Sequence, residues 1–305
     1  MLQLLIGTNI PFMKYRRFTY VFSGIVILAP VVWLVMHGGP RYSVDFTGGE
    51  LLQVRTSRVL SADEVRKALD AGGVTGYELQ QMSGANANEF MIRARVEEGH
   101  DLFPLVQRSI QTRMPGVTVE LRRTERVGPK VGNELRQKAV WAVIWSLSSI
   151  LLYVGFRYEF KFALGAVVAL FHDVFVTLGV LCFTHREISL TVLAALLTIA
   201  GYSINDTIVV FDRIRERSKA LRKEKHSRVM DIAVNETLSR TIITAFTVFL
   251  SALALFVWGG EVLRDFSFAM LVGVAFGTYS SVYVASALAL DIWIFLDRRK
   301  GIQAE

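Results

Sequence analysis

Residues 188–211 read ISLTVLAALLTIAGYSINDTIVVF, and a single charged side chain, Asp206, interrupts this apolar run. A helix that crosses a membrane needs about 20 apolar residues, so the run is long enough to span one. A carboxyl group at bilayer depth costs about 2.5–3.5 kcal/mol, so such acids usually face a bundle interior or a water path. Asp206 is therefore a candidate for proton or ion coupling. The alternative is a neutral acid that pins two helices together.

Similar apolar runs recur along the chain and predict six membrane helices. The other five lie at residues 18–36, 139–156, 162–183, 241–258 and 266–296. The first follows basic residues as a signal peptide does, but it is long and no Ala-x-Ala site precedes Tyr42, so we expect an uncleaved anchor. The last is longer than one crossing requires, so we expect it to tilt or protrude.

Basic residues gather in alternate loops and predict the orientation of the chain. They precede the first run, separate the second from the third, and follow the fourth and the sixth: Lys14, Arg16, Arg17, Arg157, Lys161, Arg213, Arg215, Arg217, Lys219, Arg222, Lys223, Lys225, Arg228, Arg298, Arg299 and Lys300. The opposite short loops hold only Arg186 and Arg264. The positive-inside rule then predicts a multi-pass protein of the cytoplasmic (inner) membrane with both termini cytoplasmic and an exported loop after the first helix.

The same distribution argues against nucleic-acid binding, because the net charge of +7 follows from membrane topology. Cys182 is the only cysteine, which excludes an intramolecular disulfide and a cysteine-based metal site. We predict no cofactor other than a transported ion.

The sequence divides into an anchor (1–37), an exported domain (38–138), five membrane helices (139–297) and a cytoplasmic tail (298–305). In the exported domain we predict the order strand-helix-strand-strand-helix-strand. The strands are expected at 50–55, 77–82, 90–96 and 117–121. The first helix begins at a capping box in 61–64, and the second is expected at 101–114. This order is that of an α+β ferredoxin-like sandwich. That fold says little about chemistry, and contact with another protein is its expected role.

Two glycine-containing motifs flank the exported domain. DFTGG at 45–49 contains Asp45, Gly48 and Gly49, and VGPKVG at 127–132 contains Gly128, Pro129 and Gly132. Turn formation is the simplest interpretation, because glycine adopts positive φ and proline fixes a corner. A hinge near the membrane is the functional alternative.

Polar side chains accompany Asp206 on its predicted helix. Tyr202 and Ser203 precede it by four and three residues, so their hydroxyls share its face and are candidates to solvate or protonate it. Asn205 is displaced from that face and is expected to serve a second helix. Asp212 begins the charged run six residues later, which places Asp206 about 9 Å inside the cytoplasmic boundary.

Arg240 and Thr244 mark the entry to the fifth apolar run. A short loop would make the fourth and fifth helices an antiparallel pair and bring Arg240 to the depth of Asp206. An adjacent arginine would favour the carboxylate and burial the neutral acid, so a switch between these states suits a proton cycle. Snorkelling of a boundary arginine is the alternative.

Two further features lie within apolar runs. His172 and Asp173 are adjacent in the third run, so they point about 100° apart on a helix and cannot chelate one ion together. A proton relay and a helix-pairing hydrogen bond both remain open for them. Gly273, Gly277 and Ser281 recur every four residues in the sixth run and predict a helix-packing stripe.

An intramembrane serine hydrolase would need Ser203, in the triplet Gly201-Tyr202-Ser203, paired with a histidine such as His172. The triplet is too common to carry this interpretation, and we predict that the chain is not an enzyme.

Five motifs taken together resemble the SecD/SecF family of protein-export membrane proteins, in the resistance-nodulation-division superfamily. They are VDFTGG (44–49), VGPKVG (127–132), LFHD (170–173), GYSINDTIVVFDR (201–213) and NETLSRT (235–241). The resemblance covers essentially the whole chain, with no departure at these motifs.

The resemblance implies half of a pseudo-symmetric bundle of two six-helix halves, with SecD supplying the other half as a separate chain or as part of a fusion. It also implies use of the proton-motive force, or of sodium in some relatives, to drive late steps of preprotein export beside the SecYEG translocon. Asp206 would be the coupling acid, with Arg240 and Thr244 in the same relay, and His172 and Asp173 match polar positions of the family. Besides SecD and SecYEG, the implied partners are YajC, the emerging preprotein and the lipid bilayer.

Two other functions remain open at this point. One is a non-coupling structural subunit that holds SecD against the translocon. The other is a small-molecule exporter of the same superfamily, although such exporters usually carry larger external domains and both halves in one chain.

Overall fold

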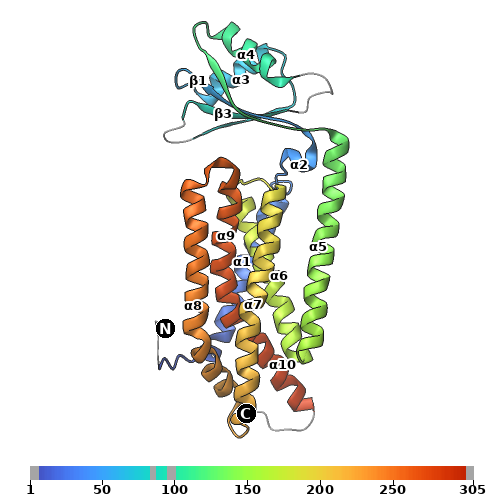
Figure 1. The fold of residues 1–305 in the computed structure, drawn as a ribbon, viewed down its shortest axis with the longest axis vertical. Coiled ribbons are helices and arrows are strands. Elements are labelled where there is room, and N and C mark those ends of the chain that lie inside the picture. Colours follow the sequence, from blue (N-terminus) through green and yellow to red (C-terminus); the bar gives the residue numbers. More distant parts are fainter. Residues whose placement is uncertain (1–6, 83–86, 95–100, 300–305) are drawn as a thin grey trace. The chain divides into compact units, whose positions relative to one another are not determined.

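The computed structural model describes residues 7–82, 87–94 and 101–299, without the side chains of residues 129, 160, 261 and 262. The chain forms two compact units, a membrane unit of residues 1–41 and 141–305 and a small domain of residues 42–140 (Figure 1). Within the described ranges, six helices are long and apolar enough to cross a membrane: Phe12–Met36, Lys130–Arg157, Lys161–Phe183, Leu190–Ala220, His226–Trp258 and Leu263–Arg299. The prediction of six membrane helices is confirmed.

The helices extend beyond the apolar runs that predicted them. In order they are η1 (Phe12–Tyr15), α1 (Arg16–Met36), α5 (Pro129–Arg157), α6 (Phe160–Phe183), α7 (Leu190–Ala220), α8 (His226–Trp258), α9 (Gly260–Ser280), the π-helical η3 (Ser281–Ala285) and α10 (Ser286–Arg299). Charged pairs stabilise the extensions: Glu236 of α8 accepts hydrogen bonds from Arg213 and Arg217 of α7. The last apolar run is not one regular helix, because η3 widens it between α9 and α10.

The membrane unit is a bundle in which α6, α7, α8 and α9 pack side by side, with α1 and α10 against α6 (Figure 1). Small residues permit the closest approaches. A Cβ added at Gly273 of α9 would lie 2.3 Å from Cδ1 of Ile199 on α7, and one at Gly179 of α6 would lie 2.4 Å from Cβ of Pro30 on α1. A glycine at each position therefore lets the two helices touch.

The first and last parts of the described chain meet at one end of the bundle, at the start of α8. The Met13 N–H donates to Asp231 at 2.9 Å, and the side chain of Asn235 both donates to and accepts from the backbone of Ile10. His226 hydrogen-bonds Asp297 of α10 at 2.8 Å and stacks on Trp293. These contacts hold three segments together at the end where the basic residues gather.

The small domain has the predicted ferredoxin-like order. Its elements are α2 (Val44–Thr47), β1 (Gly49–Thr56), α3 (Ala62–Ala71), β2 (Tyr77–Gln81), β3 (Glu89–Ala94), α4 (Leu102–Arg113) and β4 (Val119–Val127). The sheet order is β2-β3-β1-β4 with all neighbours antiparallel. Residues 83–86 of the predicted turn and residues 95 and 96 of the predicted third strand lie outside the described residues.

The last strand was predicted too short, at 117–121. It runs from Val119 to Val127 because it pairs with β1 along the whole of that strand, with one register shift between Gln53 and Val54. As an edge strand it tolerates charged residues that hide its pattern in the sequence. The core of the domain lies between the sheet and the two helices, with Leu52 and Ile92 fully buried.

The two glycine motifs, about 80 residues apart in the sequence, touch each other. Gly48 and Gly49 have φ of 67° and 120°, values that only glycine adopts readily, which supports the turn interpretation there. Pro129 begins α5. A Cβ on Gly132, in the first turns of α5, would lie 3.0 Å from the backbone N of Gly48. A hinge at this contact stays a prediction.

Gly72 leaves no room for a larger side chain, because Ser109 packs directly against it. A Cβ there would lie 1.8 Å from Oγ and 2.5 Å from Cβ of Ser109, on α4. We predict that Gly72→Ala lowers the free energy of unfolding of the small domain by about 1–3 kcal/mol, as overpacking typically does. Hydrogen exchange at the Leu52 amide in the full chain measures this, and Ser109→Gly in the same chain is the compensating change. Equal losses with and without Ser109→Gly would contradict the steric explanation.

The capping box of α3 makes the start of this helix sensitive to acid. Both the backbone N–H and the hydroxyl of Ser61 donate to the Glu64 carboxylate at 2.8 Å. These bonds, the backbone one first, hold the pKa of Glu64 below its ordinary value. The stabilisation is therefore present above the ordinary glutamate pKa and is lost as pH falls through the lowered value. Exchange of the Val65 amide should accelerate over that range, and Glu64→Gln should remove this pH dependence; an unchanged dependence in the variant would count against the cap.

Candidate functional site

Asp206 lies in the middle of α7 and is buried where three elements meet. Its side chain accepts a hydrogen bond at Oδ1 from the Thr241 hydroxyl of α8 (2.8 Å) and at Oδ2 from the Ser281 hydroxyl of η3 (2.6 Å). Only 6% of the residue is exposed. The direct hydrogen-bond partners of the acid are thus neutral hydroxyl groups.

The fold brings these donors to Asp206 from distant parts of the sequence. The loop between Ala220 and His226 is short, so α7 and α8 run antiparallel, as predicted, and Thr241 comes level with Asp206. Sequence spacing alone does not identify Thr241 as a partner of Asp206, although it follows Arg240 directly. Ser281 was assigned to helix packing, and its hydroxyl contacts the acid as well. Its spacing from Gly277 was a signal that it faces the same interior.

Arg240 and Thr244 surround the site without contacting its carboxyl group. Arg240 is exposed on the surface of the bundle and acts on Asp206 electrostatically, with no direct ion pair between these two described residues. The Thr244 hydroxyl donates to the backbone carbonyls of Arg240 and Thr241. Tyr202, half-buried on α7, interacts with the hydroxyls of Thr244 and Thr278. These three predicted residues therefore form an outer layer.

The expectation that Tyr202 and Ser203 solvate Asp206 is wrong for direct contacts. Both lie one turn from Asp206, but the short Ser203 side chain is directed to α6, where its hydroxyl donates to Asp173. Asn205 is exposed, consistent with a position away from the face of Asp206. Helical spacing identified the shared stripe of α7, but not which neighbouring helix each hydroxyl reaches.

His172 and Asp173 form a second buried cluster on α6. Nδ1 of His172 lies 2.9 Å from Oδ1 of Asp173, and Oδ2 of Asp173 accepts hydrogen bonds from Ser203 and, at 2.6 Å, from Ser280. Asp173 is fully buried and His172 is 3% exposed. The other ring nitrogen of His172, Nε2, is buried with no hydrogen-bond partner among the described residues.

The prediction that His172 and Asp173 point apart needs correction. Their Cβ atoms diverge as on any helix, but the ring places Nδ1 within reach of the neighbouring carboxyl group, and both side chains face the interior. This arrangement also differs from a hydrolase triad. Ser203 donates to the carboxylate and not to the histidine, so His172 is not placed to deprotonate it.

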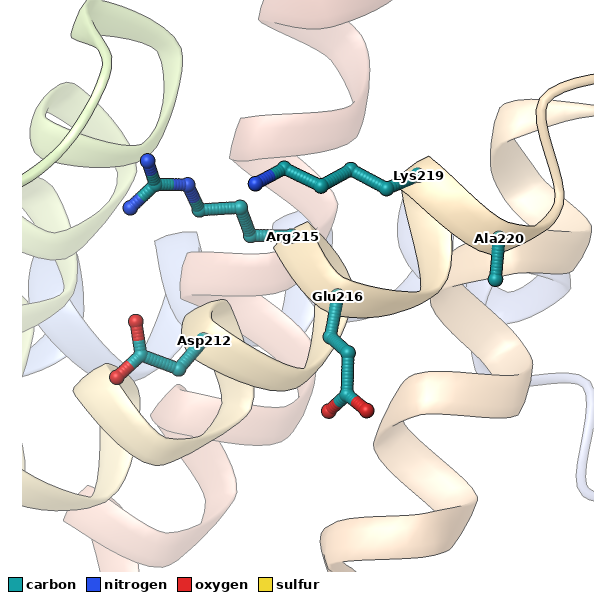
Figure 2. Close-up of a pocket in the computed structure, with 5 residues that line it drawn as sticks. All are labelled: Asp212, Arg215, Glu216, Lys219 and Ala220. Carbon is teal, nitrogen blue, oxygen red and sulfur yellow. The ribbon is translucent and has the colours of Figure 1, made fainter.

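A shallow, open depression lies at the far end of α7, beyond Asp212. Figure 2 shows Asp212, Arg215 and Lys219 extending to one side of the helix and Glu216 to another. Asp212 is paired with Arg157 at 3.4 Å. Charges of both signs on an exposed helix are typical of a solvated surface, and this depression does not contain Asp206 or Asp173.

The chemistry available at the two buried clusters is that of oxygen ligands. Among the described residues, no group of three or more histidine, cysteine or acidic side chains is arranged to hold a metal ion. A carboxyl group with two hydroxyl partners can exchange a proton, because each hydroxyl can donate or accept. The same oxygens are also the ligand type that hard cations prefer.

Comparison with known proteins identifies the family of the chain. The family described as "Protein export membrane protein SecD/SecF, C-terminal" matches residues 107–294, more than half of the chain. The chain is 43% identical over 289 residues to the protein translocase subunit SecF of Vibrio alginolyticus, covering 94% of this chain and 90% of that protein. It is 40% identical over 293 residues to the SecF subunit of Rhodothermus marinus, covering 94% of each.

A solved structure shows the same fold. The chain superposes on SecDF of Thermus thermophilus, described as a translocon-associated membrane protein, with a TM-score of 0.84 and 37% identity. The match covers 95% of this chain and 39% of the longer SecDF chain. The chain therefore belongs to the SecD/SecF family of protein-export membrane proteins, and the relatives that it matches along nearly its whole length are SecF subunits of protein translocase.

Proposed function

We propose that this chain is an energy-coupled subunit of the Sec translocase that works with SecD, using a proton or sodium gradient to drive late steps of preprotein export. The observation that carries the proposal is the Asp206 carboxyl group, buried between α7, α8 and η3 with only hydroxyl partners. A buried carboxylate without a directly paired cation is costly, so it readily gains a proton or a cation. Asp206 is thus suited to bind and release an ion.

Arg240 provides a physical reason why Asp206 would alternate between an ionised state and a protonated or ion-bound state. In the present arrangement it is exposed and does not pair with Asp206. A shift of α8 along α7 that brought the guanidinium to Asp206 would favour the carboxylate, and the reverse shift would favour the protonated or ion-bound acid. Helix displacement and ion occupancy would then be linked, which is what a gradient-driven cycle requires.

The polar exterior near Asp206 supports a second subunit at this face. Asn205, Arg240 and Thr244 are exposed at the level of an apolar bundle, where lipid contact would be unfavourable. SecD is the proposed occupant, because the chain corresponds to 39% of the SecDF chain that it matches. The SecYEG translocon, YajC and the emerging preprotein are the further proposed partners. In this proposal the protein resides in the cytoplasmic membrane with both termini cytoplasmic, as the basic loops favour.

The small domain would then lie outside the cytoplasm and contact the preprotein. The glycine contact between Gly48 and Gly132 would act as its hinge, because packed glycines allow rotation where side chains would block it.

A non-coupling structural subunit is the second candidate, and one observation favours it. The hydrogen bonds of Asp206 to Thr241 and Ser281 connect three elements, which is what a pinning acid would do. The two candidates differ in what loss of the charge changes: the export rate or the assembly of the bundle.

Asp206→Asn tests the coupling role. We expect normal assembly with SecD but loss of the gradient-dependent stage of export, because the amide keeps the size of the side chain and cannot take up a proton. Export into vesicles under separately imposed proton and sodium gradients measures this and identifies the ion. Asp212→Asn is the matched control on the same helix, since Asp212 is 46% exposed and outside the cluster. Normal late-stage export by Asp206→Asn, or disassembly without a specific export defect, would instead support the structural candidate.

Thr241→Val tests the hydrogen bond to Asp206. A bond to a charged group contributes about 1.5–3 kcal/mol, so we expect gradient-dependent export to slow by about tenfold or more. Thr237→Val is the matched control one turn earlier, because the hydroxyl of Thr237 is also buried but donates only to backbone carbonyls of its own helix. Equal rates for the two variants would show that the Thr241 contact plays no part in coupling.

A further inference from the structure

The two buried acid clusters are joined by adjacent serines. Ser280 donates to Oδ2 of Asp173, and Ser281 donates to Oδ2 of Asp206, each at 2.6 Å. Consecutive residues on a helix point about 100° apart, so one dipeptide can reach acids on two different helices. Asp173 belongs to α6 and Asp206 to α7. The two clusters are thus connected through one dipeptide.

The helix changes its winding between these two serines. Ser280 ends α9, and Ser281 begins the π-helical turn η3. The Ser286 hydroxyl donates to the backbone carbonyl of Ser281 at 3.0 Å, five residues back, and so supports the wide turn. Single π turns inside α-helices are uncommon and occur often at functional sites. A return to α geometry would rotate Ser281 relative to Ser280 and displace one hydroxyl from its acid.

Each serine has a second acceptor within its own helix. The Ser280 hydroxyl lies 3.2 Å from the carbonyl oxygen of Gly277, and the Ser281 hydroxyl lies 3.1 Å from that of Thr278. A serine has one hydroxyl proton, which it can direct to the acid or to the carbonyl. When an acid is ionised the proton favours the carboxylate, and when the acid is neutral or ion-bound the backbone carbonyl competes. Both serines are therefore two-position donors.

A second connection runs through α7 itself. Ser203 donates to Asp173 and lies one helical turn before Asp206. A movement of α7 that follows a change at Asp206 would therefore alter the hydrogen bonds of Asp173. Among the residues that the structure describes, charged or titratable groups also face the pair: His172 beside Asp173, and Arg240 and Tyr202 toward Asp206.

We propose that Asp173 and Asp206 form a linked pair, with Ser280 and Ser281 as the positioning residues that transmit a change of ion occupancy from one acid to the other through the wide turn η3. Occupancy of Asp206 releases Ser281 to the carbonyl of Thr278, the turn adjusts, and Ser280 changes its donation to Asp173. The use of this linkage in export rests on the proposed function, but the linkage itself does not.

Infrared difference spectroscopy of the full chain in lipid nanodiscs, with no gradient and no preprotein, tests the linkage. The C=O stretching band of each acid when protonated, or its carboxylate stretching bands when ionised, assigned with Asp173→Asn and Asp206→Asn, reports its hydrogen bonds. We expect Asp206→Asn to shift the Asp173 band, and Ser280→Ala, which removes a contact of Asp173 only, to shift the Asp206 band. Ser267→Ala is the matched control, because this buried serine of α9 bonds only to carbonyls of its own helix.

Bands that respond only to changes in their own cluster would overturn the proposal. If Ser280→Ala does not assemble, the effect of Asp206→Asn on the Asp173 band decides the question alone. Because no export is measured, a shifted Asp173 band together with normal export by Asp206→Asn would retain the linkage and reject the coupling function. Bands that do not respond to each other, together with defective export by Asp206→Asn, would reject the linkage and retain the coupling function.

Discussion

The burial of the Asp206 carboxyl group in an apolar bundle is the constraint on which the rest of the membrane unit depends. Removing a carboxylate from water is unfavourable unless hydrogen bonds or a counter-charge replace its hydration. Here the hydroxyls of Thr241 and Ser281 supply those bonds from two other elements. The positions of α8 and η3 relative to α7 are therefore tied to the state of one side chain.

Close helix packing makes that dependence effective. Gly273 lets α9 approach α7 so closely that a side chain larger than hydrogen would not fit there. Gly165 brings α6 against the backbone of η3, because a Cβ on Gly165 would lie 2.8 Å from the Ala285 carbonyl oxygen. Tightly packed interiors do not deform gradually, so a change at one acid is expected to move whole elements. The wide turn at η3 is the place where the winding of the last helix departs from α geometry. It lies beside both buried acids.

The small domain is built on different principles. Its sheet and two helices enclose a separate apolar core, and its helix starts are fixed by local hydrogen bonds such as the capping box of Ser61 and Glu64. A second cap is not local: the buried carboxylate of Glu50, in β1, accepts from the Leu102 N–H at the start of α4. A domain with its own core can act as one body.

The sequence by itself determined the six membrane helices, the ferredoxin-like order of the small domain and the choice of Asp206 as the candidate acid, because hydrophobic run length, turn residues and an isolated charge are local signals. Only the tertiary structure decided the partners of Asp206. Ser203 shares its helical face but bonds to Asp173, whereas Thr241 and Ser281, distant in sequence, reach its carboxyl group. The length of β4 and the contact of Gly48 with Gly132 were also decided there. Periodicity gives the direction of a side chain from its own helix axis, but the neighbour that it meets depends on how helices pack and wind, and those are properties of the whole bundle.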